Sequence, residues 1–256
     1  METAAVAPEK LLAMVPDCHA QREALQWVEQ QRHFLQSASF AAHKLDAYVP
    51  VTLGDVVQKN DSDRLRRFWH RRFFLAVLLA DWACYADMAH KEPYSHLRRV
   101  VGRFPSGFRL WMQMLDDATA VPIGYSGWHP ISEARFEQLH REPAKVPGRS
   151  ALTPLETLHP SENYLYIFNF STIPQAHKTH VTKALLQTLA ADLQNVPQRG
   201  LAAVAVSAAG RRIAARFGLV RTGTLLHEGQ PEDVFACRTS GGLPGKRFLE
   251  RPPGRL

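Results

Sequence analysis

The sequence predicts an α+β fold, and three observations carry this prediction. Residues 164–170 are almost all aromatic or branched apolar residues, which is typical of a strand buried on both faces. From about residue 178 to residue 193, apolar side chains recur every four positions, as on one stripe of an amphipathic helix. Residues 108–115 alternate apolar and polar side chains, and a turn leads to a returning strand at 121–128, which indicates a β-hairpin.

Length and composition limit the classes of protein to consider. The chain has 256 residues, of which 45% are hydrophobic, enough for one sizeable domain with an added segment. Its formal charge of +7 permits a nucleic-acid surface but does not demand one. The three cysteines are odd in number and widely spaced, which favours reduced thiols over a disulfide framework or a zinc site. Residues 1–8 lack the pattern of a signal peptide, and the apolar run at 73–80 is shorter than the roughly 20 residues that span a bilayer. We therefore expect a cytoplasmic protein.

The first half of the chain is expected to be largely helical. Residues 1–45 have helical spacing and form an N-terminal extension that is a dimerisation arm of a homodimer, a lid or a simple addition. Residues 47–57 predict a short strand that turns into a helix. Asp61 or Ser62 then caps a long helix that ends before Pro93.

Arginines and aromatic residues interleave over 64–74 in that long helix. Two interpretations fit this pattern. One is a nucleic-acid element. The other, which we favour, is a helix with a solvated basic side and an aromatic side in the core.

The second half of the chain contains a long insertion followed by alternating strands and helices. Residues 129–161 are the insertion, with a short helix and a Pro-rich connection, and either shape substrate selectivity or serve as structural padding. Residues 200–210 predict a strand of small residues, and the next helix places Ala209, Ile213 and Phe217 on one face and ends at Gly218. Two strands with a turn at 228–232 follow, and residues 241–256 form a flexible basic tail.

This order of elements, from about residue 47 to residue 240, resembles the GNAT N-acetyltransferase superfamily. The resemblance implies a GNAT-like domain at 46–240, with a central mixed, mostly antiparallel sheet flanked by helices. In that family a loop written Q/R-x-x-G-x-G/A, between the central strand and its helix, wraps the pyrophosphate of coenzyme A. The loop falls on residues 177–182, where His180 and Thr182 replace the family's small residues. A Cβ at these positions limits how closely the backbone approaches a phosphate.

The same resemblance implies a set of binding residues and a co-substrate. Acetyl-coenzyme A, or another acyl-coenzyme A, would be bound without a metal by backbone N–H groups and by the positive end of the helix dipole. A backbone N–H within residues 170–173 would polarise the thioester. The implied binding residues are Phe170, Thr172, Ile173, His177, Lys178, Thr179, His180, Val181 and Thr182.

Three residues are candidates for catalysis. The tyrosine that commonly protonates the leaving thiolate in the family is matched here by Ala214, and an asparagine near the end of the preceding strand by Ser207. Glu162 is the carboxylate nearest the central strand, and His129 ends the hairpin and is a second possible base, since an unperturbed histidine titrates near neutral pH. Ordinary surface or capping roles are the competing interpretation for Ser207, Glu162 and His129.

Our leading hypothesis is an N-acyltransferase that moves an acyl group, with acetyl as the first choice, from coenzyme A to an amine. One alternative is a GNAT-shaped binding or regulatory module without catalysis, since the small residues and the tyrosine are absent. Another is an acyl-carrier-protein donor, because the segment VPIGYSGWHPIS is similar to a stretch of the toxin-activating lysine acyltransferases. A nucleic-acid-binding protein rests on charge alone.

Overall fold

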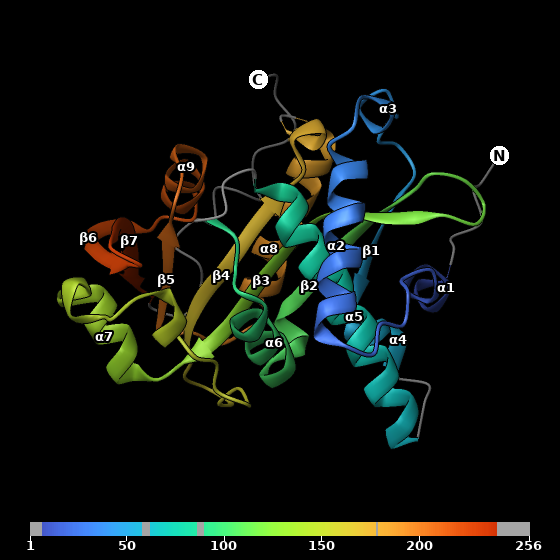
Figure 1. The fold of residues 1–256 in the computed structure, drawn as a ribbon. Helices are drawn as coiled ribbons and strands as arrows, with labels where there is room; N and C mark the ends of the chain where they lie inside the picture. The colour runs from blue at the N-terminus through green and yellow to red at the C-terminus, as the bar shows by residue number, and fades with distance from the viewer. Residues whose placement is uncertain (1–6, 58–61, 86–89, 178, 240–256) are drawn as a thin grey trace. The chain divides into compact units, whose positions relative to one another are not determined.

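The computed structural model describes residues 7–57, 62–85, 90–177 and 179–239. In this part of the chain, seven strands form one mixed sheet in the order β1-β2-β3-β4-β5-β7-β6, with helices packed along it (Figure 1). The α+β fold class predicted from the sequence is therefore confirmed. The tail at 241–256 lies outside the described residues, and the predicted domain division stays a prediction.

The strands are β1 (Tyr48–Thr52), β2 (Phe108–Met114), β3 (Ala120–Ile131), β4 (Tyr164–Thr172), β5 (Gly200–Ala205), β6 (Val220–His227) and β7 (Gln230–Arg238). The helices are α1 (Pro8–Ala13), α2 (Gln21–Leu35), α3 (Ala38–Ala41), α4 (Leu53–Val57), α5 (Asp63–Cys84), α6 (Tyr94–Arg103), α7 (Glu133–Arg141), α8 (His180–Gln194) and α9 (Ala208–Arg216). The chain divides into two compact units, Met1–Ser126 with Ser171–Leu185 and Gly127–Phe170 with Leu186–Leu256.

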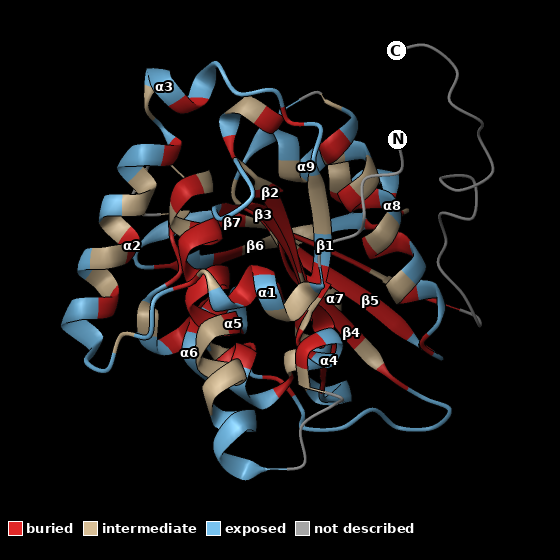
Figure 2. Ribbon diagram, turned by 90° about the vertical axis from the view of Figure 1, so that its right-hand side faces the viewer, coloured by how far each residue is buried: buried red, intermediate tan, exposed pale blue. Residues whose placement is uncertain are grey.

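The core of the first unit forms around α5. Residues 73–80 of this helix are all buried, so the run is a core helix segment, as its short length requires (Figure 2). β1 pairs antiparallel with β2, from Tyr48 opposite Gln113 to Thr52 opposite Arg109. The helices α1, α2 and α3 confirm the helical character predicted for the N-terminal segment.

The long helix ends before Pro93, as predicted: α5 ends at Cys84, and Tyr85 already has extended backbone angles. A further helix, α6, was missed, although Leu97, Val100, Val101 and Phe104 lie at helical spacing and are all buried.

β2 was expected to be half-buried, and this was wrong. Trp111 and Gln113, on the face predicted to be polar, are buried as deeply as Leu110 and Met112 on the other face. The ring of Tyr48, from the neighbouring strand, lies 5.1 Å from the Trp111 ring. Both faces of β2 are therefore covered, which residue alternation alone does not reveal.

In the second unit, β4 pairs parallel with β5, and β7 pairs antiparallel with both β5 and β6. Close packing against α7 explains the glycine at the start of β5. A Cβ on Gly200 would meet the Phe136 ring at 2.4 Å, so this strand start accepts only glycine beside α7. Gly218 has φ 78° just after α9, which confirms its predicted helix-ending role.

Some boundaries in the second unit differ from those predicted. β3 continues to Ile131, so the irregular part of the insertion starts only at Ser132, and the expected short helix is α7. The last hairpin turns at Glu228 and Gly229, which have φ 50° and 80°. The buried face of α9 carries Ala214 rather than Ala209, because a helix face drifts from a strict four-residue repeat.

Candidate functional site

The link between β4 and α8 is the predicted ligand-binding turn. β4 runs to Thr172 and α8 begins at His180, so the strand is longer and the helix starts later than predicted. A short 3₁₀ turn at Pro174–Ala176 lies between them. Lys178, one of the predicted binding residues, lies outside the described residues.

Side-chain hydrogen bonds hold this turn together. The Thr182 hydroxyl donates to Ala176 O at 2.6 Å, and the Thr179 hydroxyl donates to the same oxygen at 2.6 Å. Thr182 Oγ1 therefore accepts from Thr172 Oγ1, 3.3 Å away. His177 Nε2 donates to Thr172 O at 3.0 Å. The structure thus brings four of the predicted binding residues together, with Thr179, just before α8, and Thr182, in its first turn, bonded back to the loop.

The two remaining predicted residues at this helix start play different parts. Val181 is fully buried, so only its backbone can reach a ligand. His180 is exposed, and its ring lies 5.5 Å from the Tyr48 ring at an angle of 41°. The side chain that replaces the family's glycine therefore rests against a residue of β1.

The backbone of β4 changes its pairing along the strand. Its register with β5 ends at Ile167 opposite Ala203, although both strands continue, to Thr172 and to Ala205. The later part of β4 is therefore not used in pairing with β5. The Ile173 N–H, by contrast, donates to Ile123 O at 2.9 Å, so it is engaged with the segment of β3, and the polarising role of an N–H within residues 170–173 stays a prediction.

Gly124 permits the close approach of chain segments at this point. A Cβ on Gly124 would meet Ser171 O at 2.7 Å and Thr172 Cγ2 at 3.0 Å. Any larger residue would push against the backbone just ahead of the ligand-binding turn.

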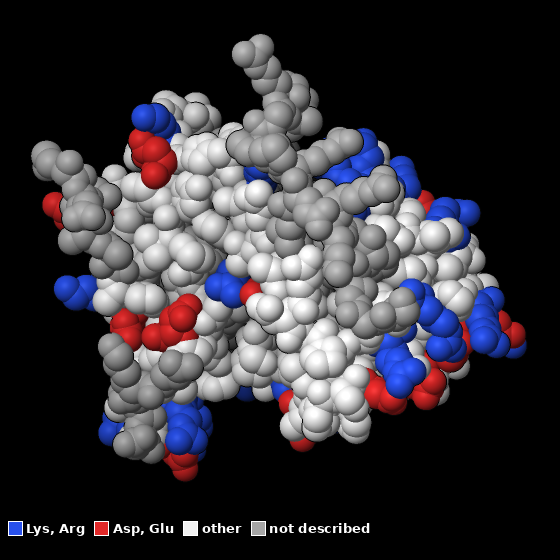
Figure 3. Space-filling view, turned by 180° about the vertical axis from the view of Figure 1, so that it is seen from behind, with Lys and Arg blue, Asp and Glu red and all other residues white. Residues whose placement is uncertain are grey.

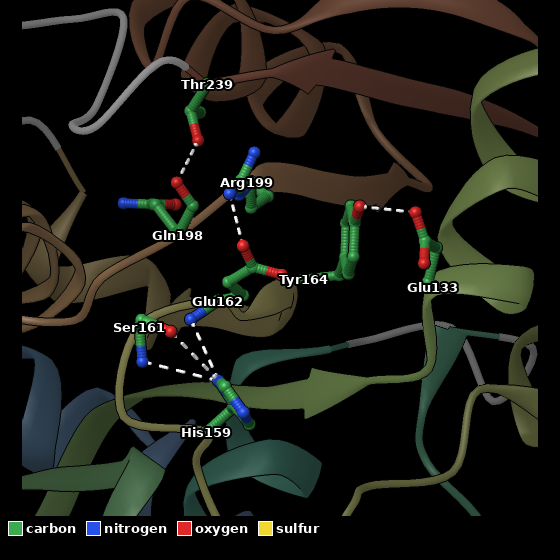
Figure 4. A network of polar contacts seen from close by, with 8 residues as sticks. All are labelled: Glu133, His159, Ser161, Glu162, Tyr164, Gln198, Arg199 and Thr239. Atoms are coloured by element: carbon green, nitrogen blue, oxygen red, sulfur yellow. Dashed lines mark hydrogen bonds and ion pairs between the residues drawn. The ribbon is translucent and has the colours of Figure 1, made fainter.

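The three catalytic candidates lie in the second unit and are engaged in different contacts. Ser207 caps α9 and accepts the Gly210 N–H at 3.0 Å. Glu162 pairs with Arg199 at the surface, and its N–H donates to His159 Nδ1 at 3.2 Å (Figure 4). The ring of His129 is buried, 5.3 Å from the Tyr166 ring.

Figure 4 shows Glu162 bonded to Arg199 and His159, with further hydrogen bonds near the start of β4. Tyr164 donates to Glu133 at 2.7 Å, and Thr239 donates to Gln198 O at 2.7 Å beside Arg199. The Glu162–Arg199 pair links the segment just before β4 to the residue before β5 at an exposed position. Catalysis by Ser207, Glu162 or His129 stays a prediction.

Ala214, which stands where the family carries its tyrosine, is buried on α9 with 3% of its surface exposed. Its methyl group fills space in the core and offers no proton. A general acid, if the reaction uses one, therefore comes from another position.

Sequence reasoning missed a buried polar network in the first unit. Asp81 Oδ1 accepts the Tyr125 hydroxyl at 2.7 Å, and its Oδ2 accepts the Glu92 N–H at 2.9 Å. Glu92 Oε2 in turn lies 2.8 Å from His96 Nδ1. Burial, with the Asp81 charge second, raises the pKa of Tyr125 well above its usual value. The available signal was a carboxylate directly after the apolar run of α5, since buried carboxylates are rare unless paired.

Cys84, at the end of α5, lies beside Ser171 of β4. Burial raises the pKa of its thiol far above the usual range, and a hydrogen bond with Ser171 only partly offsets this. The thiol is therefore protonated near neutral pH and is a poor nucleophile.

The described part of the chain contains neither a metal-binding cluster nor a membrane-spanning helix. No group of three or more His, Cys, Asp or Glu side chains there is arranged to hold a metal ion. Among the same residues, no helix combines the length and the apolar character needed to cross a membrane.

The chain was compared with protein-family models, with curated proteins and with solved structures. No family model and no curated protein matches the chain. Among solved structures, NAA60 of Arabidopsis thaliana with a bisubstrate analogue is 15% identical, with a TM-score of 0.43, over 77% of this chain and 100% of that one. The NatC complex bound to Gag peptide and CoA is 9% identical, with a TM-score of 0.48, over 76% and 100%. The GphF GNAT-like decarboxylase with isobutyryl-CoA is 11% identical, with a TM-score of 0.47, over 75% and 99%.

The order of elements in the chain itself agrees with what the sequence resemblance implied. An antiparallel hairpin leads to the central strand β4, its helix α8, the parallel strand β5, the helix α9 and a final hairpin. The described elements thus follow the GNAT-like order that the resemblance implied, around one mixed sheet.

Proposed function

We propose that the protein is an acyltransferase that binds acyl-coenzyme A at the turn between β4 and α8 and transfers the acyl group to an amine. The observation that carries this proposal is the end of pairing between β4 and β5 at Ile167. A strand whose later backbone is not paired on that side can offer N–H groups to the carbonyl of a thioester.

The turn itself fits a phosphate-bearing group. The first N–H groups of a helix have no partner within the helix, and the positive end of the dipole favours an anion. The hydroxyls of Thr179 and Thr182 bond to Ala176 O, so these side chains fold back into the loop. The donor set for the pyrophosphate would thus be the backbone of the first turn of α8.

Acyl transfer at this site would depend mainly on how the protein positions the two reactants. Transfer requires a neutral amine, a donor for the developing oxyanion and a leaving thiolate. The β4 backbone would supply the oxyanion donor. Ala214 supplies no acid, so the reaction would depend on orientation of the reactants, which alone can lower a barrier by about 7–11 kcal/mol.

The first test is calorimetric titration with acetyl-coenzyme A and with free coenzyme A. We expect dissociation constants on the order of micromolar for the wild-type protein. His180→Glu adds a negative charge at the turn and should abolish binding, whereas His180→Gly lets the backbone approach the pyrophosphate and should tighten it. His159→Glu, the same substitution at an exposed histidine of the insertion, is the matched control.

The outcomes separate the alternatives. No binding of either ligand would contradict the proposal, and so would binding that ignores both His180 substitutions. Ala214 favours one second candidate, a module that binds acyl-coenzyme A without turnover. Binding at the turn without acyl transfer to any amine in a mixed panel would support that module. The acetyl group, the homodimer and the cytoplasmic location predicted from the sequence stay predictions.

A further inference from the structure

The arginines singled out in the sequence of α5 lie beside further arginines on α6. α2, α5 and α6 pack side by side in the first unit (Figure 1). The first turns of α5 stand out into solvent (Figure 2), and Arg66 and Arg67 there are exposed, as are Arg98 and Arg99 on α6. The sequence did not predict that α5 and α6 lie side by side.

A cavity of about 670 Å³ lies between these helices. Its charged lining includes Arg66, Arg67, Arg71 and Arg98, with Asp63 as its single carboxylate. A second hollow of about 520 Å³ shares Gln21, Tyr94, Arg98 and Gly102 with the first and continues to Arg99 and Arg103. The two form one continuous feature, which we call the arginine groove.

The charge of the arginine groove is only partly compensated by carboxylates. Arg67 and Arg98 form no ion pair with any described residue, and Arg66 lies 3.8 Å from Asp63. Arg71 is held by Asp17 at 3.1 Å. Burial, with the charge of Arg66 second, lowers the pKa of His70. The positive charge at neutral pH therefore comes from guanidinium groups, which stay ionised.

Arginines in the second unit are arranged differently. Arg211 and Arg221 both bond to Asp233, and Arg238 and Arg141 both bond to Glu137. Figure 3 shows basic side chains lying beside acidic ones along the right-hand edge of the view. These four arginines of the second unit are therefore neutralised by neighbouring carboxylates, unlike Arg67 and Arg98.

The floor of the groove is apolar. Ala24, Phe74, Leu75 and Val101 line the cavity and are each at most 7% exposed. An apolar floor with an arginine rim suits a polypeptide that presents carboxylates and apolar side chains together. A nucleic-acid backbone has phosphates for the rim but no aliphatic side chains for the floor. Arginine also binds carboxylates through two parallel hydrogen bonds.

The groove lies far from the ligand-binding turn. Arg67 is near the start of α5, and Cys84, at its end, contacts Ser171 of β4. Along the helix, this separation is about 25 Å. A ligand in the groove would therefore occupy a site of its own.

From these observations we infer that the arginine groove is a docking site for an acidic segment of a partner polypeptide. The carboxylates of the segment would pair with Arg67 and Arg98, and its apolar side chains would enter the cavity and contact Phe74, the most exposed of the four floor residues. This inference does not depend on the proposed acyl transfer, because the groove would bind its partner whether or not the turn binds coenzyme A.

Fluorescence anisotropy can test this inference on the full chain. The probe is a short labelled peptide of alternating glutamate and leucine, with the glutamine version as its control. We expect the acidic peptide to bind and the double substitution Arg67→Glu with Arg98→Glu to weaken binding by about tenfold or more. The matched control, Arg212→Glu with Arg216→Glu on α9, makes the same change of net charge on exposed arginines.

Several results would overturn the inference. These are equal binding of the glutamine peptide, equal weakening by the α9 control, or no binding at all. Tighter binding of a labelled oligothymidylate, lost in the same groove variant, would assign the groove to nucleic acid instead. Arg67→Gln with Arg98→Gln, together with a thermal melt of each variant, separates lost binding from lost folding.

Discussion

Single side chains in this protein take up positions that local sequence preferences do not explain. His180 stands where the resembling family has glycine, and its ring rests on Tyr48. Asp81 is a carboxylate with no exposed surface, and it is held by the Tyr125 hydroxyl and the Glu92 N–H. In both cases a residue from another element contacts the side chain: the Tyr48 ring lies beside His180, and the Tyr125 hydroxyl bonds to Asp81.

The Asp81–Tyr125 hydrogen bond yields a stability prediction. Tyr125→Phe keeps the ring but removes the donor to Asp81 Oδ1, and loss of a buried hydrogen bond should lower the free energy of unfolding by about 1–3 kcal/mol. Tyr94→Phe is the control, because the Tyr94 hydroxyl forms no hydrogen bond with a described residue. Urea denaturation measures both, and equal effects would contradict the prediction.

The same residue predicts a pH dependence. The pKa of Tyr125 is raised in the folded protein, chiefly by burial, so the folded state holds this proton more tightly than the unfolded state. Its contribution is complete below the unfolded tyrosine pKa of about 10 and is lost as the pH rises above that value. Wild-type stability should therefore fall more steeply above pH ~10 than that of Tyr125→Phe.

At the scale of elements, β3 and β4 determine the geometry of the candidate site. β4 is paired with β5 only as far as Ile167, and the segment after β4 returns to β3 through the Ile173 N–H. Gly124 of β3 makes room for the backbone of Ser171 and Thr172. The ligand-binding turn is thus positioned by strand packing and by threonine hydroxyls together.

Two glycines of the first unit should respond oppositely to alanine. Gly124→Ala places a Cβ 2.7 Å from a backbone oxygen that cannot easily move, and overpacking of this kind costs about 1–3 kcal/mol. Gly102→Ala, on α6, meets nothing within 4 Å and should stabilise the helix by about 0.5–1 kcal/mol. Denaturation midpoints compare the two variants, and a stabilised Gly124→Ala protein would contradict the close approach of β3 and β4.

At the scale of the whole molecule, long-range ion pairs join segments that are distant in sequence. Arg149, in the insertion, pairs with Glu232 of β7 at 2.8 Å, and both side chains are 8% exposed. Arg199 and Glu162 form a pair that is more than half exposed on the arginine side. The first pair ties the insertion to the final hairpin, whereas the second lies in solvent.

The two pairs should differ in what their loss costs. Glu232→Gln leaves the buried Arg149 guanidinium without this carboxylate, which should destabilise the protein by about 3–5 kcal/mol. Glu162→Gln, at a solvated pair, should cost at most about 1 kcal/mol. Thermal or urea unfolding of both variants provides the comparison, and similar losses would show that the insertion is not anchored by Arg149.

The sequence by itself determined the elements whose signals are local. Apolar periodicity located β4 and α8, alternation located the β2–β3 hairpin, and Gly218 ended α9, because these patterns report directly on the period of the backbone. The resemblance implied the order of the elements along the chain and a mixed sheet. The sequence also predicted ligand binding at the turn after β4, which stays a prediction, and the structure describes all of the predicted binding residues except Lys178.

Only the tertiary structure decided which groups meet across elements. The Ile173 N–H is taken by Ile123, His180 rests on Tyr48, and Asp81 bonds to Tyr125, which are contacts between residues far apart in the chain. The arginines of α5 had two interpretations in the sequence, and their grouping with those of α6 around an apolar floor required both helices to be placed. Local preferences fix the backbone period of each element, but packing and hydrogen bonding between elements decide which faces meet.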